Sequence, residues 1–515
     1  MSTALPPLTP ARPDLRFERA DDVEVRETHI SWVFLAGDRA FKVKKPLLLP
    51  YLDYRTPAQR LAMCREEVRL NRRLAPDVYF GVRSLVPRAG GGLTLSDADD
   101  PAAGEYAVEM RRFDEADTLA ARLSRGAAGR DDIARLGRRL ALFHGDAAAE
   151  RRGDGAELVK RALDDTLATL RSQVAPGQRP RLAAHERMAA AVLSSLWEQL
   201  DARGTRGSIR DGHGDLRLEH VVLEDDALAI VDCVEFAPGL RRIDVAADLA
   251  FPVMELHRLG RADFADGLVA AYRDAGGDPG DDPLLALLAA YRAYVRAKVA
   301  FTRARQRDRD ADEDADALLG LAARLLWRAL APSVIVIAGV SASGKSTLAE
   351  LVAAESGFTL LSTDALRKAR AGLASTARAP DSLYTDAVNR ATYAALGRAA
   401  ADAAGQGAIV DGTFRRRSDR AAFFAELGEN VTSLVVECRA PARVLRARAA
   451  AREHDDRRVS DADRRVVDAQ IGAFEPLDEV AAHDHLLLRA DRDPAELVSE
   501  LGEAAARHAT ASPAR

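Results

Sequence analysis

The chain has 515 residues, of which 47% are hydrophobic and 30% are charged, so it is long enough for about two to four globular domains. Its 74 basic and 79 acidic residues nearly balance, which argues against bulk binding of nucleic acid but leaves room for a local basic groove. The three cysteines are widely spaced, which excludes a disulfide framework and a C-x-x-C zinc site. The chain has no apolar run of roughly 20 residues, which excludes a membrane span. The opening MSTALPPLTPARPDL lacks the apolar core of a signal peptide or anchor, so the predicted location is the cytoplasm.

Residues 15–110 are predicted to form short strands and one helix. SWVFLAG (31–37) and RAFKVKK (39–45) have the pattern of neighbouring strands, and residues 56–75 have the pattern of a helix that ends before Pro76. Residues 130–200 and 245–330 read as helical, while residues 208–236 alternate polar clusters with short strands.

Two aspartates in residues 208–236 form a constellation suited to phosphoryl transfer. Asp215 lies in a loop, and Asp232 ends a strand further along the chain. Asp215 can accept the proton of an attacking hydroxyl, and Asp232 can hold Mg²⁺ against the phosphates of ATP. Upstream, Lys42 can contact phosphates and Glu67 can pair with it from the predicted helix. Lys44 lies on the same strand face as Lys42, so the choice between the two lysines stays open.

Each of these residues also has a purely structural interpretation. An isolated Asp is usually a turn or cap residue, Lys42 would suit an exposed strand, and Glu67 would suit a solvent-facing helix position. His213 is expected to make structural hydrogen bonds rather than to take part in catalysis.

A second domain is predicted to begin near residue 331, because a buried strand starts at Ser333. Strand-like runs recur at 333–338, 358–362, 408–412, 433–438 and 485–490, with helical stretches between them. This alternation is typical of a parallel α/β sheet.

The first of these strands leads into G-x-x-x-x-G-K-S, the pattern of a phosphate-binding loop. The backbone N–H groups of the loop can surround phosphate oxygens, Lys345 can reach the β- and γ-phosphates, and the Ser346 hydroxyl can bind Mg²⁺. A chance Gly/Ser turn would not also supply the strand before it and the helix after it. The residues of this predicted nucleotide site are Gly339, Val340, Ser341, Ala342, Ser343, Gly344, Lys345 and Ser346.

Three further features of the second domain suit phosphoryl transfer. Asp364 follows the second strand, where a carboxylate can deprotonate an acceptor hydroxyl; the alternative is a helix N-cap. Asp411 ends the third strand and could bind Mg²⁺ through water; the alternative is an ordinary turn. Arg448 and Arg452 share a helix face and could neutralise charge on the transferred phosphoryl group; the alternative is a solvated helix.

HGDLRLEH (213–220), IVDCVEF (230–236) and RRIDVAADLAF (241–251) resemble segments of aminoglycoside phosphotransferase-like kinases, which share the bilobal protein-kinase fold. The resemblance spans roughly residues 25–300 and lacks a Gly-rich loop before the strand lysine. It implies a catalytic base at Asp215, an Mg²⁺ ligand at Asp232, an ATP-binding lysine at Lys42 paired with Glu67, and a brace for the catalytic loop at Asp248. Where the family has a metal-binding Asn, this chain has His220, which can coordinate a metal but is a poorer ligand for Mg²⁺.

GVSASGKST, STDALRK, IVDGTF, the R-x-x-x-R helix and QIGAFEP (470–476) resemble P-loop kinases related to zeta toxins and polynucleotide kinases. This resemblance spans about residues 333–500. It implies Asp364 as base, Ser346 and Thr347 with Lys345 at phosphate and Mg²⁺, and the two arginines in a lid. The whole chain resembles bacterial fusions of the two kinase types.

The sequence therefore predicts a protein of two domains, α+β and α/β. Residues 15–330 would form a kinase-like domain of the aminoglycoside phosphotransferase type, and residues 331–515 a P-loop kinase domain. The predicted function is transfer of the ATP γ-phosphoryl group to hydroxyl acceptors with Mg²⁺, by two modules on one chain. Two alternatives are an N-terminal pseudokinase that regulates the P-loop half and a P-loop ATPase without a small-molecule acceptor.

Overall fold

The computed structural model of the protein describes residues 12–17, 23–49, 52–89, 91–224, 227–306, 313–330, 333–374, 377, 379–452 and 464–511. The chain divides into two compact units. The first contains Met1–Leu158 and Leu200–Gly280, and the second contains Val159–Gln199 and Asp281–Arg515. The predicted domain ranges, 15–330 and 331–515, stay predictions. The second unit combines the residues after 331 with helical segments that precede them in the chain.

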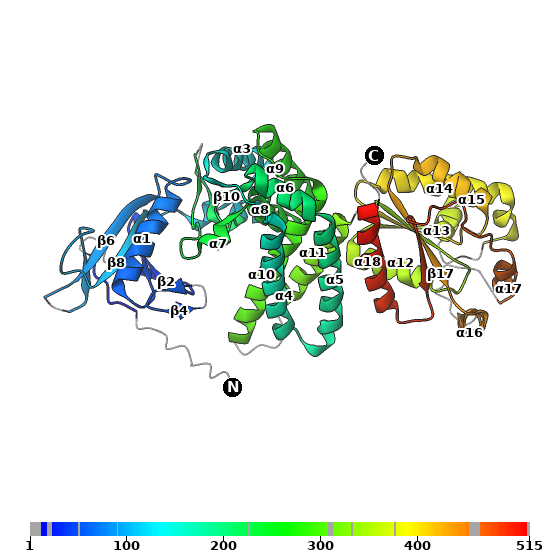
Figure 1. Ribbon diagram of the computed structural model, residues 1–515, viewed down its shortest axis with the longest axis horizontal. Helices are drawn as coiled ribbons and strands as arrows, with labels where there is room; N and C mark the ends of the chain where they lie inside the picture. Colours follow the sequence, from blue (N-terminus) through cyan, green and yellow to red (C-terminus); the bar gives the residue numbers. More distant parts are fainter. Residues whose placement is uncertain are drawn as a thin grey trace. The chain divides into compact units, whose positions relative to one another are not determined.

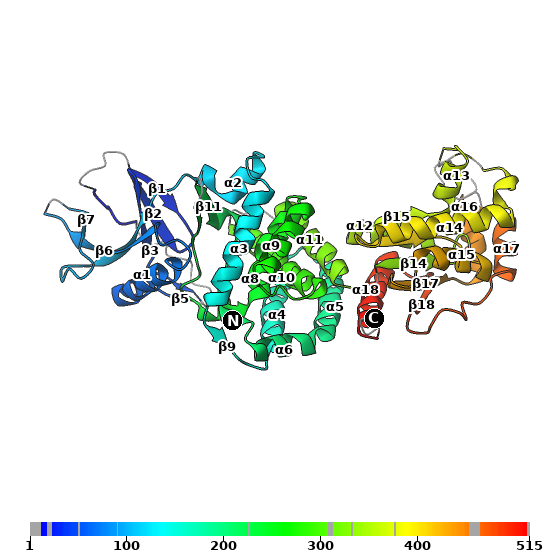
Figure 2. The ribbon, with the colours of Figure 1, turned by 90° about the horizontal axis from the view of Figure 1, so that it is seen from above.

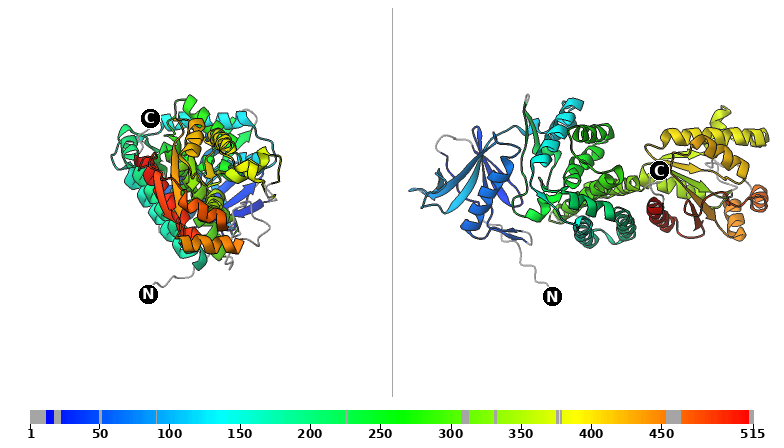
Figure 3. Two further views of the ribbon diagram at one scale, coloured as in Figure 1. Left: turned by 90° about the vertical axis from the view of Figure 1, so that its right-hand side faces the viewer. Right: turned by 45° about the horizontal axis from the view of Figure 1, so that its top comes forward.

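The first unit begins with a six-stranded antiparallel sheet in the order β1-β2-β3-β8-β6-β7. Helix α1 (Pro57–Asn71) lies on one face of this sheet, as Figure 1 and the right panel of Figure 3 show. Its buried residues Cys64 and Val68 belong to the hydrophobic cluster that packs against the sheet. A capping box at Thr56 fixes the start of α1, as expected for a helix that begins after a Thr. The strands are β1 (Val23–Glu27), β2 (Ser31–Ala36), β3 (Arg39–Lys44), β6 (Tyr79–Pro87), β7 (Leu93–Ser96) and β8 (Glu105–Arg111).

The predictions for this region are largely confirmed. Strands β2 and β3 pair in an antiparallel hairpin, as predicted for residues 31–45. The helix predicted for residues 56–75 is present but ends at Asn71, and its C-cap is Arg72.

The rest of the first unit is mostly helical, with short strands that carry the polar loops. Helix α3 (Arg130–Asp146) packs beside α9 (Ala262–Asp274) and α8 (Val245–Arg258) packs on α9. The short elements are β4 (Leu48–Leu49), β5 (Leu52–Asp53), η1 (Glu115–Asp117), α2 (Leu119–Ser124), β9 (Ala149–Glu150), β10 (Ile209–Asp211), η3 (Leu218–His220), β11 (Val221–Glu224), β12 (Ala227–Ile230), α7 (Pro238–Arg241) and β13 (Arg242–Asp244).

The second unit contains a five-stranded parallel sheet in the order β15-β16-β14-β17-β18. Its strands lie within about two residues of the five predicted runs, so the predicted parallel α/β sheet is confirmed. They are β14 (Val334–Ala338), β15 (Thr359–Ser362), β16 (Ala408–Asp411), β17 (Ser433–Arg439) and β18 (His485–Arg489).

Helices cover both faces of this sheet. α12 (Lys345–Ser356) and α18 (Pro494–Ala511) lie on one side, and α14 (Asp386–Ala403) and α15 (Arg417–Leu427) lie side by side on the other (Figures 1 and 2). The remaining helices are α5 (Arg179–Ser195), α10 (Asp282–Gln306), α11 (Glu313–Ala329), α13 (Thr363–Arg370), α16 (Ala442–Arg452) and α17 (Arg464–Gly472), with short turns η2 (Pro176–Gln178) and η4 (Asp381–Tyr384). α4 (Gly155–Gln173) and α6 (Trp197–Arg206) each contribute residues to both units.

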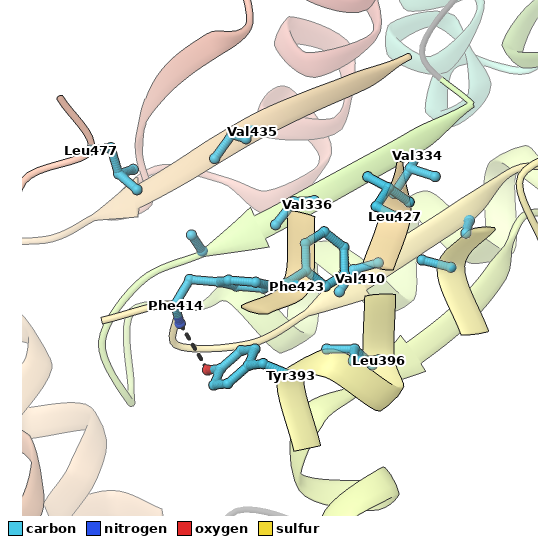
Figure 4. Packing of buried hydrophobic residues seen from close by; sticks show 13 residues of the cluster. Val334, Val336, Tyr393, Leu396, Val410, Phe414, Phe423, Leu427, Val435 and Leu477 are labelled. Atoms are coloured by element: carbon cyan, nitrogen blue, oxygen red, sulfur yellow. Dashed lines mark hydrogen bonds between the residues drawn. The ribbon is translucent and has the colours of Figure 1, made fainter. Parts of the chain in front are cut away.

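The core between the sheet and α14 and α15 is built around aromatic side chains (Figure 4). Phe423 is fully buried and meets Phe414 edge to face, with ring centroids 5.2 Å apart. The hydroxyl of Tyr393 accepts a hydrogen bond of 3.0 Å from the backbone N–H of Phe414. This bond anchors the segment after β16, which adopts a left-handed conformation at Phe414.

Truncation of this aromatic core should destabilise the second unit. Phe423→Ala is expected to lower the free energy of unfolding by about 3–5 kcal/mol, because it removes a fully buried ring from a packed layer. Leu351→Ala is the matched control, since Leu351 is 41% exposed and its loss should cost within about 0.5 kcal/mol. Urea unfolding followed by circular dichroism measures both; equal losses in the two variants would contradict the assignment of this core.

Candidate functional sites

The predicted phosphate-binding loop joins β14 to α12 with the backbone that such a loop requires. Gly339 has φ +150°, and a Cβ there would lie 2.7 Å from the carbonyl oxygen of Cys438. Gly344 has φ +99° and Ala342 has φ +65°, so the chain turns sharply before the helix. The loop therefore leads directly into the N-terminus of α12, where unpaired N–H groups favour an anion.

Side chains around the loop have buried polar atoms that suit a bound phosphate and cation. Lys345 Nζ lies 3.9 Å from Asp411 Oδ1, and both side chains are about 90% buried. Within the described part of the chain, neither Asp411 Oδ1 nor Ser343 Oγ has a hydrogen-bond partner. Because unpaired buried polar atoms are costly, these atoms fit a site that is completed by Mg²⁺ and nucleotide.

The carboxyl ends of three strands meet beside the loop. In the parallel register Asp411 is opposite Ile337 of β14 and Ser362 of β15. Thr363 donates a hydrogen bond of 2.9 Å from its hydroxyl to the carbonyl of Asp411. This arrangement brings Asp411 and the start of α13 to the same edge of the sheet as Lys345, where ligands of such sheets bind.

Asp364 lies in the first turn of α13, but it does not cap the helix. The N-cap is Ser362, whose side chain accepts from the N–H of Ala365. Asp364 instead accepts a bond of 2.5 Å from Arg367, one turn on, and its side chain stays 30% exposed. Arg367 also donates to Asn389 at 3.1 Å, so it is anchored independently of Asp364.

Sequence reasoning did not single out Arg367. The signal was available, because residues three apart on a helix lie on one face and an Asp–Arg pair at this spacing can form an ion pair. Arg367 is 6% exposed, so it is well placed to orient the Asp364 carboxylate.

The predicted lid helix, α16, lies against the phosphate loop. Arg448 donates to the carbonyl oxygens of Ser343 at 3.0 Å and Ala490 at 2.9 Å. Gln470 on α17, another residue not predicted, accepts a bond of 2.7 Å from the N–H of Ser341. Arg448 and Gln470 therefore brace the loop backbone. The side chain of Arg452 lies outside the described residues, so a role of either arginine at the transferred phosphoryl group stays a prediction.

In the first unit, Lys42, Glu67 and Asp232 form one charged cluster. Lys42 Nζ lies 2.6 Å from Asp232 Oδ1 and 2.9 Å from Glu67 Oε1. Burial alone would lower the pKa of Lys42, but the carboxylates of Asp232 and Glu67 outweigh it and raise that pKa well above its usual value. Desolvation alone would raise the pKa of Asp232, but the Lys42 ammonium lowers it well below its usual range. Lys42 is therefore a cation and Asp232 an anion at neutral pH.

Lys42 and Lys44 have different surroundings. Lys44 is fully buried, 2.7 Å from Glu67 Oε2, and it also contacts Glu235. Lys42 lines a cavity of about 1020 Å³ together with Asp232 and His220. Lys44, which also pairs with Glu235, thus holds Glu67 from the buried side, while Lys42 faces the space where a nucleotide could bind.

The loop of Asp215 is braced by Asp248, as the resemblance implied. Asp248 accepts from the backbone N–H groups of His213 at 2.6 Å and Gly214 at 2.9 Å. His213 has a structural position, as expected: it is fully buried, and its Nε2 lies 2.9 Å from the carbonyl of Val231. The Asp215 side chain remains 38% exposed, so its carboxylate is accessible to an acceptor.

His220 lies between the two aspartates. Its Nδ1 is 2.8 Å from the carbonyl oxygen of Asp215, and its Nε2 is 3.7 Å from Asp232 Oδ2. The structure thus places Lys42, Asp232 and His220 at one cavity. Glu67 contacts Lys42 and the backbone of Asp215 contacts His220, but neither residue lines that cavity. Asp364 and Asp411 lie at the edge of the parallel sheet with Lys345.

Comparisons with known proteins give one family model and several relatives. A family model described as an AAA domain matches residues 334–477. Uncharacterized proteins of Mycobacterium tuberculosis and Mycobacterium bovis are 34% identical over 436 residues, which is 82% of this chain and 84% of theirs.

Two solved structures that match part of the chain are kinases by name. A choline/ethanolamine kinase family protein from Mesorhizobium loti is 17% identical and covers 60% of this chain and 88% of its own, with a TM-score of 0.36. A gluconokinase from Sinorhizobium meliloti is 23% identical and covers 35% of this chain and 92% of its own, with a TM-score of 0.26.

The fold class predicted from the sequence is confirmed at the level of architecture: one unit combines an antiparallel sheet with helices, and the other has a P-loop beside a five-stranded parallel sheet. The residues matched by the AAA domain model include the phosphate-binding loop, Asp364 and Asp411. Among the described residues, no helix combines the length and apolar character that crossing a bilayer requires.

Proposed function

This chain belongs to the same family as the mycobacterial proteins that match it over most of their length, and from that premise we propose that it is an ATP-dependent phosphotransferase with two kinase modules. Each module would transfer the γ-phosphoryl group of ATP to a hydroxyl of an acceptor. The observation that carries the proposal is the grouping of Lys345, Asp411 and Asp364 beside the phosphate loop at one edge of the sheet.

In the P-loop module the chain's own groups have distinct roles. The loop N–H groups and Lys345 would bind the β- and γ-phosphates. Ser346 and Asp411 would hold Mg²⁺, directly or through water, and Thr347 would be a neighbouring phosphate or metal contact. When bound, Mg²⁺ neutralises charge on the phosphates. Asp364, oriented by Arg367, accepts the proton of the acceptor hydroxyl. The acceptor oxygen bonds to the γ-phosphorus while the bond from that phosphorus to the bridging oxygen breaks and ADP leaves.

The first unit would perform the same reaction with a different constellation. Lys42, aligned by Glu67, contacts the phosphates, Asp232 is placed for a metal, and Asp215 accepts the acceptor proton. One observation favours a second candidate function for this unit, nucleotide-dependent regulation of the P-loop module: His220 stands at the position of a second metal ligand, where Mg²⁺ prefers oxygen.

A panel of hydroxyl acceptors tests the proposal. ATP consumption is measured with sugars, aminocyclitols, nucleosides and oligonucleotides with a free 5′-hydroxyl, for the wild type, Lys345→Ala and Asp215→Asn. Two active modules predict that each substitution removes a different acceptor-dependent activity. If only Lys345→Ala matters, the first unit is regulatory. If no acceptor stimulates ATP consumption, the proposal of a phosphotransferase fails and an ATPase remains.

A further inference from the structure

The hydrogen bonds of His220 determine which of its nitrogens can act as a ligand. Nδ1 lies 2.8 Å from the backbone carbonyl oxygen of Asp215, which can only accept a hydrogen bond. Nδ1 must therefore carry the proton in the neutral ring, and Nε2 carries the lone pair. Within the described residues Nε2 makes no hydrogen bond, although the His220 side chain is only 11% exposed.

The lone pair of Nε2 lies among oxygen atoms that are too distant for hydrogen bonds. Asp232 Oδ2 and Glu219 Oε1 are each 3.7 Å from Nε2. Asp232 Oδ1 is already bound to Lys42 at 2.6 Å, so Oδ2 is the oxygen left facing His220. Two ligand atoms that each lie about 2.0–2.2 Å from one ion are about 3–4 Å apart, which fits the separation of Nε2 and Oδ2.

From this geometry we infer that the first unit binds a first-row divalent transition metal through His220 Nε2 and Asp232 Oδ2, in preference to Mg²⁺. Imidazole nitrogen suits such ions, whereas Mg²⁺ prefers oxygen and loses its water reluctantly. Glu219 is paired with Arg217 and is left out of the ligand set. Two protein ligands leave positions for phosphate oxygens and water, so the inference rests on the proposed nucleotide binding at this cavity.

Binding of the ion at His220 and Asp232 does not require a complete set of protein ligands. Across the described ranges there is no group of three or more His, Cys, Asp or Glu side chains arranged to hold an ion by themselves. The ion would therefore bind more tightly with nucleotide than without it, because the phosphates complete its coordination.

Pulsed electron paramagnetic resonance with Mn²⁺ as the probe tests the inference on the full chain. Mn²⁺ is added with the β,γ-methylene analogue of ATP, whose phosphate chain contains no nitrogen, and electron spin echo modulation from a directly bound nitrogen-14 is recorded. The wild type is expected to show imidazole nitrogen coupling. His220→Asn, which keeps a donor for the Asp215 carbonyl, is expected to lose that coupling.

The same variant should change metal preference. The Mn²⁺ over Mg²⁺ affinity ratio of this site is expected to fall at least about 10-fold in His220→Asn, since even loss of an outer-shell partner costs about 10–100-fold in metal affinity. His483→Asn is the control, because His483 is 53% exposed on the second unit and should leave both the coupling and the ratio unchanged. The P-loop site, whose predicted ligands are oxygens, supplies a metal signal without nitrogen coupling in every variant.

Two results would overturn the inference: no nitrogen coupling in the wild type, or coupling that persists in His220→Asn. Calorimetric titration of the same nucleotide into wild type and Lys42→Met measures nucleotide binding in the cavity. This measurement distinguishes failure of the metal assignment from failure of the proposed function. Binding that is lost in Lys42→Met but occurs without nitrogen coupling would contradict the metal assignment alone. If Lys42→Met binds the nucleotide as the wild type does, nucleotide binding in this cavity is contradicted. The echo modulation is then recorded with Mn²⁺ alone. Nitrogen coupling that is present in the wild type and lost in His220→Asn would support the metal assignment, and its absence would contradict it.

Discussion

Replacement of Asp364 by Asn is expected to lower kcat of the P-loop module by about 10²–10⁴-fold, the range for loss of a general base. Asn keeps the shape of the side chain and an oxygen that can accept from Arg367, which lies 2.5 Å from the native carboxylate. Only the capacity to take up a proton is removed. Nucleotide binding should be unchanged, because the proposed phosphate contacts come from the loop and Lys345 rather than from α13. Steady-state kinetics with an acceptor found in the panel, and calorimetric titration of ADP, measure the two quantities.

Asp386→Asn is the matched control for this experiment. Asp386 lies in the first turn of α14, its side chain is 63% exposed, and it pairs with Arg416. Its neutralisation should leave kcat nearly unchanged. If both variants lose the same activity, or if Asp364→Asn keeps full kcat, Asp364 is not the base.

Replacement of Asp248 by Asn is expected to lower the free energy of unfolding of the first unit by about 3–5 kcal/mol at neutral pH. This is the usual cost of removing one partner from a buried ion pair. Asp248 is fully buried and accepts from the N–H groups of His213 and Gly214, with His144 Nε2 at 3.2 Å. An Asn has one acceptor oxygen in place of two, so a buried N–H group would lose its partner. Urea unfolding followed by far-ultraviolet circular dichroism measures the loss. Asp266→Asn, at an exposed position of α9, should have little effect.

The effect of Asp248→Asn should depend on pH. Burial alone would raise the pKa of Asp248, but His144, His213 and the bond from the backbone N–H of His213 lower it far below the usual value. A carboxyl group with a lowered pKa in the folded state stabilises above its unfolded pKa of about 3.9 and loses that contribution as pH falls toward the folded pKa. The difference in stability between wild type and variant should therefore be largest above about pH 5 and shrink below about pH 4. A difference that stays constant over this range would contradict the charge-based role.

The P-loop module could be predicted closely because its signals are local. Gly339, Gly344 and Lys345 lie within seven consecutive residues, and the backbone of such a loop is dictated by its own glycines. The five strands were recognisable because a buried parallel strand is a short apolar run bounded by polar residues. Gln470 could not be found in this way, since nothing local in QIGAFEP indicates a contact with Ser341, 129 residues earlier.

The site of the first unit was predictable as a set of residues but not as a geometry. Asp215, Asp232 and His220 were recognisable from their spacing and their resemblance to a known family. The position of His220 Nε2 beside Asp232 Oδ2, with Nδ1 bound to the carbonyl of Asp215, depends on how the loop and the β11–β12 hairpin pack.

By itself, the sequence determined the phosphate loop, the order of the parallel strands along the chain and the identities of the candidate bases, because these depend on short stretches of backbone. Only the tertiary structure decided that Lys42 rather than Lys44 faces the cavity and that Arg367 orients Asp364. It also showed that the helical segment 159–199 belongs to the same compact unit as the parallel sheet. The physical reason is that alternation along a strand places Lys42 and Lys44 on the same face, and only the carboxylates contributed by distant segments, Asp232 and Glu235, distinguish them.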